Sequence, residues 1–287
     1  MKTQKSFDQN QTGTLYLVPT PIGNLEDMTF RAINTLKSVD IVACEDTRVT
    51  QKLFNHFEID VPKLSYHEHN LQRLTNQIIQ ELFAGKDVAQ VSDAGMPSIS
   101  DPGVELVEAA VEAGIPVVAL PGANAALTAL IASGLAPQPF TFYGFLSRKR
   151  SELNEELETL KDKKETLIFY ESPHRLKQFL KELVRVFGEE RQVVLARELT
   201  KRYEEFIRGT ANEVYEWAEQ TELRGEFVVM VAGSDDVIEE NYWENWTVLE
   251  HIEYKIDYEK MSSKDVIKAI AKERGLMKRG VDAEDHQ

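Results

Sequence analysis

The sequence predicts an α/β protein whose first half forms a largely parallel sheet. Short β-branched segments alternate with helical patterns along most of the 287 residues, and Pro/Gly-rich turns follow several of these segments. Such alternation is typical of strands joined by crossover helices. The composition, 42% hydrophobic and 28% charged, is that of a soluble globular protein and leaves room for one large or two medium domains.

The first half contains four strand-like and four helical segments. The last helix is followed by Gly114, as helix C-termini often are. The strands are expected at Leu15–Pro19, Asp40–Cys44, Val88–Ser92 and Pro116–Leu120, and the helices at Asp27–Lys37, Arg48–Phe57, Leu71–Ala84 and Gly103–Ala113.

Residues 114–147 contain no Asp, Glu, Lys or Arg. Four prolines interrupt this run and leave about 14 helix-compatible residues, whereas a bilayer needs about 20. We therefore expect buried core here rather than a membrane span.

The second half repeats the pattern with more charge. Its strands are expected at 141–146, 166–170, 193–197 and 227–233, and its helices at Leu153–Leu160, His174–Phe187 and Ala211–Gln220. In FYESPHR (169–175) and LARELTKRYEEF (195–206), charged residues directly follow apolar strands. A carboxylate at such a strand end is either part of an ion pair or a ligand contact.

The charge is unevenly distributed. The total is −15, residues 235–253 hold seven acids and no Lys or Arg, and residues 260–279 hold seven bases against two acids. The acidic stretch is interpreted as a linker or docking segment. In SSKDVIKAIAKERG, Ser262 and Asp265 have capping-box-like spacing and Gly275 suits the helix end. Such a basic helix is either a solvated face or a contact for a polyanion.

Three Pro/Gly-rich turns follow strands, at 18–24, 91–103 and 120–126. Each alone is typical of an ordinary turn. Together, with Asp93 and Asp101 within one of them, they favour a nucleotide-like or cofactor site at the carboxyl ends of the strands. The P-loop and G-x-G-x-x-G patterns are missing, which disfavours P-loop NTPases and dinucleotide-binding proteins.

Glu45, Asp46 and Arg48 follow the second strand. Asp46 is suited to cap the next helix, and the alternative is that these charges face a reacting group. His67 and His69 give a weak metal pattern with no third ligand, so His69 is interpreted as a polar or substrate contact. The single Cys44 and the polar start of the chain favour a reduced, cytoplasmic environment.

The sequence contains, in this order, the motifs VPTPIGN, CEDTR, HEHN, VSDAGMPSISDPG, PGANAALTALIASGL, GFLSRKR, IFYESPHR, ARELTK and GEFVVMV. With these motifs the chain closely resembles the ribosomal RNA branch of the tetrapyrrole-methylase superfamily, whose members are the class III S-adenosylmethionine-dependent enzymes. The resemblance extends from about 13 to 279. It implies two α/β domains with the cofactor in the cleft between them, at 13–121 and 122–234, followed by an acidic linker and basic helical segment at 235–287. It also implies a homodimer that 2′-O-methylates cytidine 1402 of 16S rRNA, free or in the 30S subunit.

Carried onto this sequence, the resemblance places S-adenosylmethionine against residues of both domains, with no metal. Those residues are Pro21, Asp93, Ala94, Gly95, Ser98, Ala123, Asn124, Tyr170, Glu171, Arg197 and Glu198. Glu45 or Asp46 would accept or orient the hydroxyl and Arg48 would position a phosphate, with His69 as a further catalytic candidate. For RNA contact we expect Lys264, Lys268, Lys272, Lys278 and Arg279.

Two other functions remain open from the sequence. A methylase of a tetrapyrrole or another small metabolite would use the same fold, but the first turn, PTPIGN, is less glycine-rich than such enzymes usually have. A non-catalytic RNA-binding or ribosome-assembly factor would have little need for three cofactor-type turns.

Overall fold

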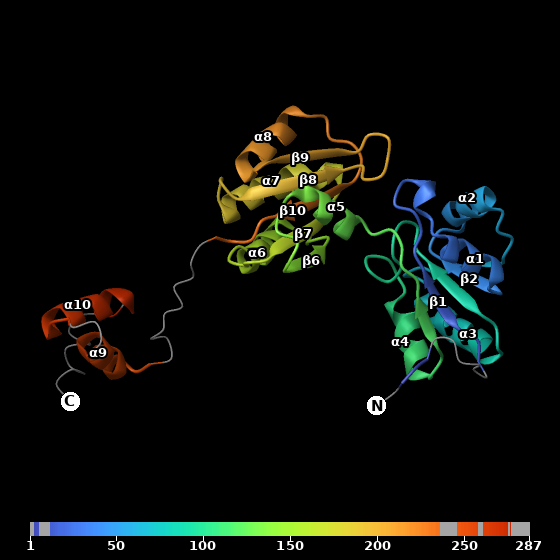
Figure 1. Cartoon of the computed structure of the whole chain (residues 1–287), viewed down its shortest axis with the longest axis horizontal. Helices are drawn as coiled ribbons and strands as arrows, with labels where there is room; N and C mark the ends of the chain where they lie inside the picture. The colour runs from blue at the N-terminus through green and yellow to red at the C-terminus, as the bar shows by residue number, and fades with distance from the viewer. Residues whose placement is uncertain (1–2, 6–11, 236–245, 258–260, 275, 277–287) are drawn as a thin grey trace. The chain divides into compact units, whose positions relative to one another are not determined.

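A computed structural model of the chain describes residues 3–5, 12–235, 246–257, 261–274 and 276. The chain divides into two compact units, Met1–Ser234 and Asp235–Gln287. The first unit contains two five-stranded sheets, and the second contains two helices (Figure 1).

The first sheet is entirely parallel, as the alternating pattern predicts. Its order is β3-β2-β4-β1-β5. The strands are β1 (Leu15–Val18), β2 (Ile41–Cys44), β3 (Lys63–Ser65), β4 (Val88–Val91) and β5 (Val117–Ala119). The intervening helices are α1 (Phe30–Ser38), α2 (Thr47–Phe57), α3 (Leu71–Phe83) and α4 (Val104–Glu112).

Helices cover both faces of this sheet. On one face, Leu36 of α1 and Phe54 of α2 pack with Val42 and Val91 of the strands. On the other, α3 and α4 pack against Leu15, Ala43 and Val88. Each fully buried Leu, Val or Phe side chain contributes about 1.5–3 kcal/mol to the free energy of folding. The sheet is therefore rigid where its strands end, which is the edge that carries the turns of interest.

The second sheet has the order β6-β7-β10-β8-β9 and is mixed. Only β6 and β7 are parallel, and the other neighbours are antiparallel. Its strands are β6 (Phe140–Gly144), β7 (Thr166–Glu171), β8 (Gln192–Arg197), β9 (Glu205–Thr210) and β10 (Phe227–Val231). Its helices are α5 (Ala125–Ser133), α6 (Arg150–Leu160), α7 (Pro173–Phe187) and α8 (Ala211–Gln220).

Alternate residues of these strands serve the two faces, as the two-residue period of a strand requires. Leu167, Phe169 and Val229 pack under α6, α7 and α8. Ile168 and Met230 face the other way and pack against α5, which carries Ala129 and Leu130. The uncharged segment supplies β5, α5 and β6 but is core only in part: Ala126, Ala129 and Leu130 are buried, whereas the side chain of Ile131 is 80% exposed.

Several elements differ from the sequence prediction. The first helix is two elements, a 3-10 turn η1 (Leu25–Asp27) and α1, because the side chain of Thr29 caps α1 at Ala32 N. β3 and β9 are strands that we did not predict. The acidic stretch is not simply a linker, because α9 (Val248–Asp257) begins within it.

The second unit packs α9 against α10 (Ser263–Glu273) through Ile252, Val266 and Ile270. As expected, Ser262 caps α10, and its hydroxyl accepts a hydrogen bond from Asp265 N at 3.4 Å. Among the described residues, Lys255 is buried with its Nζ 3.0 Å from Glu273 Oε1. Of the helices in the described ranges, none has the length and apolar character that crossing a bilayer requires.

Candidate functional site

Three turns at the carboxyl ends of parallel strands are joined to one another. Thr20, after β1, and Gly95, after β4, exchange backbone hydrogen bonds at 2.9 and 3.0 Å. Asn124, after β5, directs its Nδ2 at Met96 Sδ, 3.7 Å away. The turns singled out from the sequence therefore form one cluster at the edge where α/β sheets bind ligands.

The segment 92–103 is held from beneath by a buried polar side chain. Gln90 of β4 donates through Nε2 to Pro102 O at 3.0 Å and to Ser98 Oγ at 3.3 Å. Gly103 has φ +148°, and a Cβ there would overlap Gln90 Nε2 and Ser98 Oγ. The loop needs glycine at that position, because the chain passes directly over the strand.

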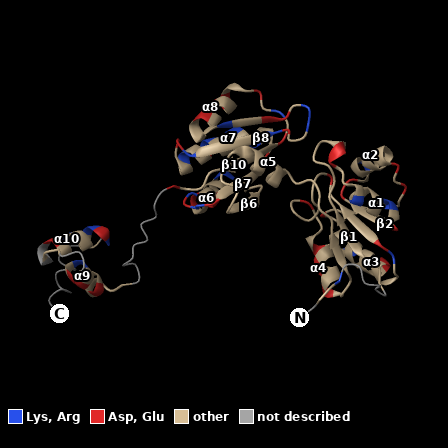
Figure 2. Ribbon diagram, viewed as in Figure 1, with Lys and Arg blue, Asp and Glu red and all other residues tan. Residues whose placement is uncertain are grey.

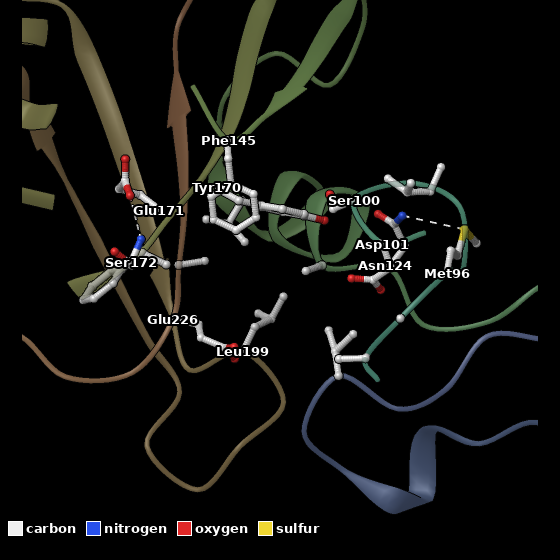
Figure 3. Close-up of a pocket in the computed structure, with 18 of the residues that line it drawn as sticks. Met96, Ser100, Asp101, Asn124, Phe145, Tyr170, Glu171, Ser172, Leu199 and Glu226 are labelled. Atoms are coloured by element: carbon white, nitrogen blue, oxygen red, sulfur yellow. Dashed lines mark hydrogen bonds between the residues drawn. The ribbon is translucent and has the colours of Figure 1, made fainter. Parts of the chain in front are cut away.

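A pocket of about 310 Å³ opens beside this cluster and also takes residues from the second sheet (Figure 3). This is the size range of small-molecule sites. Its lining is mainly apolar with a few polar groups. It consists of Ile22, Ala94, Gly95, Met96, Ile99, Ser100, Asp101, Asn124, Ala125, Phe145, Tyr170, Glu171, Ser172, Pro173, Ala196, Leu199, Lys201, Glu226, Phe227 and Val228. We call it the main pocket.

Glu171 is the most informative polar group of the main pocket. Its side chain is 1% exposed, Oε1 accepts a hydrogen bond from Ser172 N at 2.8 Å, and Oε2 lies 3.4 Å from Arg175 Nη2. Within the described chain, Oε2 accepts no hydrogen bond. Burial raises the pKa of this carboxyl, although Ser172 N–H and Arg175 oppose the shift. A buried carboxylate with an unsatisfied oxygen is costly, so it points to a ligand donor that completes it.

Tyr170 and Phe145 form the aromatic wall of the main pocket. Their ring centroids are 5.7 Å apart in an edge-to-face arrangement, and Tyr170 Oη accepts a hydrogen bond from Ala126 N at 3.2 Å. The amide of the second residue of α5 is thus already bonded within the protein. Leu127 N likewise bonds Asn124 Oδ1 at 2.9 Å, so the helix start has little left to offer an anion.

A second pocket lies beside the same loop and is polar. It is lined by Glu45, Asp46, Thr47, Arg48, Ser65 and Asp93, and we call it the acidic pocket. Asp46 caps α2 by accepting from Arg48 N at 2.8 Å. The same carboxylate binds the Arg48 guanidinium in a bidentate manner, at 3.0 Å from Nε and 2.6 Å from Nη2. Asp46 therefore caps the helix, and it also sits in a pocket.

The carboxylates here fall into two electrostatic states. The Arg48 side chain and the backbone N–H of Arg48 lower the pKa of Asp46 to about 2. Burial, followed by the charges of Asp101 and Asp93, raises the pKa of Glu45. Burial also raises the pKa of Asp93 and of Asp101, and each feels a neighbouring carboxylate. Since Asp101 lines the main pocket and Glu45 and Asp93 line the acidic pocket, this acidic trio connects the two pockets.

Five of the cofactor residues expected from the sequence line the main pocket, namely Ala94, Gly95, Asn124, Tyr170 and Glu171. Asp93 lines the acidic pocket instead. Pro21 and Ala123 lie in the clustered turns without lining either pocket, and Ser98 supports the loop from within. Arg197 donates to Arg224 O at 2.8 Å and its guanidinium lies over the ring of Phe227, and Glu198 accepts from Lys201 Nζ at 2.8 Å, so these two contact pocket residues rather than line the pocket.

Sequence reasoning did not name several residues that line the main pocket. Asp101 was noted only as an acid in the turn, and Ser172 and Phe145 only within quoted segments. Lys201 and Glu226 are 25 residues apart in sequence yet form an ion pair at 2.8 Å. No local signal could have found that pair, because it depends on how β8 and β10 are placed.

The remaining candidates lie elsewhere. His67 and His69 occupy a turn with ring centroids 5.8 Å apart, and neither lines a pocket. Lys268 and Lys272 are exposed on α10, Lys264 belongs to that helix, and Lys278 and Arg279 lie outside the described residues. In the described ranges, no group of three or more His, Cys, Asp or Glu side chains is arranged to hold a metal ion.

A family model described as "Tetrapyrrole (Corrin/Porphyrin) Methylases" matches residues 14–215. The fold and the pocket thus define a class, and the chain belongs to the tetrapyrrole methylase family. Its fold, two sheets with interleaved helices and a C-terminal helical segment, is the one that the resemblance implied.

Within that family, the chain belongs with proteins named "Ribosomal RNA small subunit methyltransferase I". It is 54% identical to the one from Bacillus subtilis (strain 168), with 98% of this chain and 97% of the relative covered. The protein of that name from Halalkalibacterium halodurans is 51% identical, with 100% of each chain covered.

Solved structures with the same fold are more distant in sequence. A cobalt precorrin-4 methyltransferase has a TM-score of 0.57 and 19% identity, covering 76% of this chain and 94% of its own. A uroporphyrin-III C-methyltransferase from Thermus thermophilus, complexed with S-adenosyl homocysteine, has a TM-score of 0.56 and 21% identity, covering 77% and 97%. These likenesses show the fold.

Proposed function

We propose that this protein is an S-adenosylmethionine-dependent methyltransferase that acts on the 2′-hydroxyl of cytidine 1402 in 16S rRNA. The observation that carries the RNA substrate is the match over almost the whole of both chains to relatives named for small-subunit ribosomal RNA methylation. The cofactor is supported by family membership and by the chemistry of the main pocket.

The main pocket fits S-adenosylmethionine. The cofactor carries two positive charges, on the sulfonium and on the ammonium group, together with hydroxyl and amine donors. Asp101, Glu171 and Glu226 offer carboxylates to such groups, and the unsatisfied Glu171 Oε2 suits a donor. Tyr170, Met96 and Leu199 offer apolar surface to an adenine ring. We propose that these residues hold the cofactor.

The bound cofactor would supply an electrophilic methyl group, so the protein has to position the ribose and accept a proton. Glu45 is the better proton acceptor of the two candidates, because its raised pKa places its basicity closer to neutral pH than that of Asp46. Asp46 instead fixes the guanidinium of Arg48, which is exposed and can bind a neighbouring phosphate. Holding the reacting oxygen in line with the methyl group can lower the activation free energy by ~7 to 11 kcal/mol.

Further parts of the proposal rest on the resemblance or on the sequence pattern. These are a homodimer, a cytoplasmic location, two lobes at 13–121 and 122–234, and RNA contacts from Lys264, Lys268, Lys272, Lys278 and Arg279. His69 is retained only as a contact for the RNA, since its exposed ring lies in a turn outside both pockets.

The deciding experiment maps ribose methylation in rRNA by mass spectrometry, in a strain lacking the gene and in the same strain with the gene restored. We expect the 2′-O-methyl group on cytidine 1402 to disappear and to return. Calorimetric titration of the purified protein with S-adenosylmethionine accompanies it. Unchanged rRNA together with cofactor binding would instead indicate a small-metabolite substrate, and unchanged rRNA without cofactor binding a non-catalytic factor.

A further inference from the structure

The segment Phe145–Lys149, between β6 and α6, begins at the main pocket, and its residues after Phe145 have no role in the site as described so far. Phe145 lines the pocket although its side chain is 57% exposed. The three residues 148–150 are all cationic, and residues 140–150 contain no Asp or Glu. The rest of the first unit is acidic, so a segment of this composition beside the pocket is unusual.

The backbone of this segment is held by groups that also shape the pocket. Arg175 donates through Nη2 to Leu146 O at 3.1 Å and to Ser147 O at 2.9 Å. The same guanidinium is the ion-pair partner of the buried Glu171. Ser147 N in turn donates to Glu156 Oε2 at 2.9 Å. The position of the segment is therefore tied to the pocket wall.

The cations that follow differ in how they are used. Arg150 Nε binds Glu182, whose side chain is 1% exposed, so Arg150 neutralises a buried acid. Lys149 makes a surface ion pair with Glu152 at 2.8 Å while its side chain stays 77% exposed. Arg148 is exposed and, within the described residues, makes no hydrogen bond or ion pair. Exposed ion pairs of this kind are weak, so Lys149 can exchange its partner for another anion.

We propose that Arg148 and Lys149 bind phosphates of the RNA strand next to the nucleotide whose ribose reaches the main pocket. This inference rests on the proposed function, because it requires an RNA substrate. Two cations on a fixed backbone beside a pocket match the way phosphate contacts set the register of a nucleic acid without reading its sequence. Figure 2, with Lys and Arg in blue and Asp and Glu in red, shows that charges of both signs occur among the elements around the second sheet.

The test compares two double variants that remove the same charge. Arg148→Ala/Lys149→Ala alters the segment. Arg31→Ala/Lys161→Ala is the matched control, since Arg31 is an exposed arginine on α1 and Lys161 forms a comparable surface pair with Glu158 at the other end of α6. That end lies about 16 Å along the helix from Lys149. The full chain is used, and binding to an RNA fragment around cytidine 1402 is measured over a range of salt concentrations.

We expect the slope of log affinity against log salt to fall by about 1.4 for the segment variant, or about 0.7 for each lost single-strand phosphate contact, and to stay at the parent value for the control. The affinity for S-adenosylmethionine should stay within about twofold of the parent in both. Equal slopes in the two variants would overturn the inference while leaving the proposed function standing. A parent protein that binds the cofactor but neither the RNA fragment nor the 30S subunit would overturn both.

Discussion

At the scale of single residues, Glu45 and Asp46 are adjacent carboxylates that the fold prepares for different tasks. Arg48 holds the pKa of Asp46 at about 2, so Asp46 remains ionised and fixed through the physiological range. Among the described residues Glu45 has no such ion pair, and burial, followed by the charges of Asp101 and Asp93, raises its pKa. The sequence left the choice of base open, and the surrounding charges favour Glu45.

Glu45→Gln should lower the single-turnover methylation rate at saturating RNA by roughly 10²-fold or more, the usual contribution of a general base. In the parent, the rate should fall as the pH drops through the raised pKa of Glu45, because the protonated carboxyl accepts no proton. The variant should lose that acidic limb. Asp46→Asn keeps the helix cap and should lose less. A larger loss for Asp46→Asn than for Glu45→Gln would contradict the assignment.

Glu171→Gln should stabilise the protein while it weakens cofactor binding. Because burial raises the folded-state pKa of Glu171, the folded chain binds this proton more tightly than the unfolded chain. The ionised carboxylate therefore destabilises the folded state at a pH above the raised pKa. As the pH falls from there toward the ordinary pKa of a glutamate, the folded chain takes up this proton and the free energy of unfolding rises.

Thermal melts of Glu171→Gln at pH 7.5 should show a gain of about 1 kcal/mol, the order of cost for an unsatisfied buried group. The gain should shrink as the pH falls toward 5, since the parent carboxyl then becomes neutral too. Affinity for S-adenosylmethionine should fall in the same variant. A variant less stable than the parent at pH 7.5 would mean that the ion pair with Arg175 outweighs the burial cost.

At the scale of elements, the strands with strong β-branched patterns could be predicted and the short or charged ones could not. β3 has only three residues, Lys63–Ser65, and β9 begins in a run of charged residues, so neither has a local apolar signature. The antiparallel pairing of β7, β10 and β8 was also out of reach, because strand direction is set by the tertiary path of the chain.

The candidate site shows the same division. The turns after β1, β4 and β5 could be predicted to converge, because parallel strands end at one edge. The contribution of Lys201 and Glu226 could not, since these lie in loops next to β8 and β10 of the second sheet. Arg197 and Glu198, which were expected to touch the cofactor, bond to Arg224 and Lys201 and do not line the main pocket, so their contact with the cofactor stays a prediction. The sequence motifs therefore predicted which turns surround the pocket, whereas the direction of each side chain decides which residues line it.

The loop 92–103 offers a prediction with an internal control. Gly103→Ala places a Cβ against Gln90 Nε2 and Ser98 Oγ, and the chain there has φ +148°. We expect a loss of about 2–4 kcal/mol in unfolding free energy and a weaker cofactor affinity, because the loop that carries Asp101 must shift. Gly114→Ala, at φ +74° with nothing within 4 Å of the new Cβ, should cost only about 1 kcal/mol and leave the cofactor affinity unchanged. Both are measured by denaturant unfolding and calorimetry.

At the scale of the whole molecule, the net charge of −15 is the sum of acidic and basic regions that lie in different parts of the sequence. The chain carries acids around a pocket suited to a cationic cofactor and places cations on limited segments, such as 148–150 and 260–279. Electrostatic attraction of RNA depends on local patches within about 10 Å at ordinary salt, so the total says little about RNA affinity. Solubility, by contrast, follows the total.

Removing residues 235–287 tests whether the local or the total charge governs RNA binding. The deleted segment contains 8 Lys and Arg against 14 Asp and Glu, so the truncated chain is less negative than the parent. Net charge alone then predicts tighter RNA binding after truncation. The basic segment 260–279 predicts the opposite, with a salt slope lower by up to about 3.5 if the five cations proposed in it contact phosphates. Because the main pocket belongs entirely to residues 22–228, affinity for S-adenosylmethionine should be retained. Filter-binding assays of the truncated and full chains between 50 and 200 mM salt measure the slope, and an equal or steeper slope in the truncated chain would rule out the helix as an RNA contact.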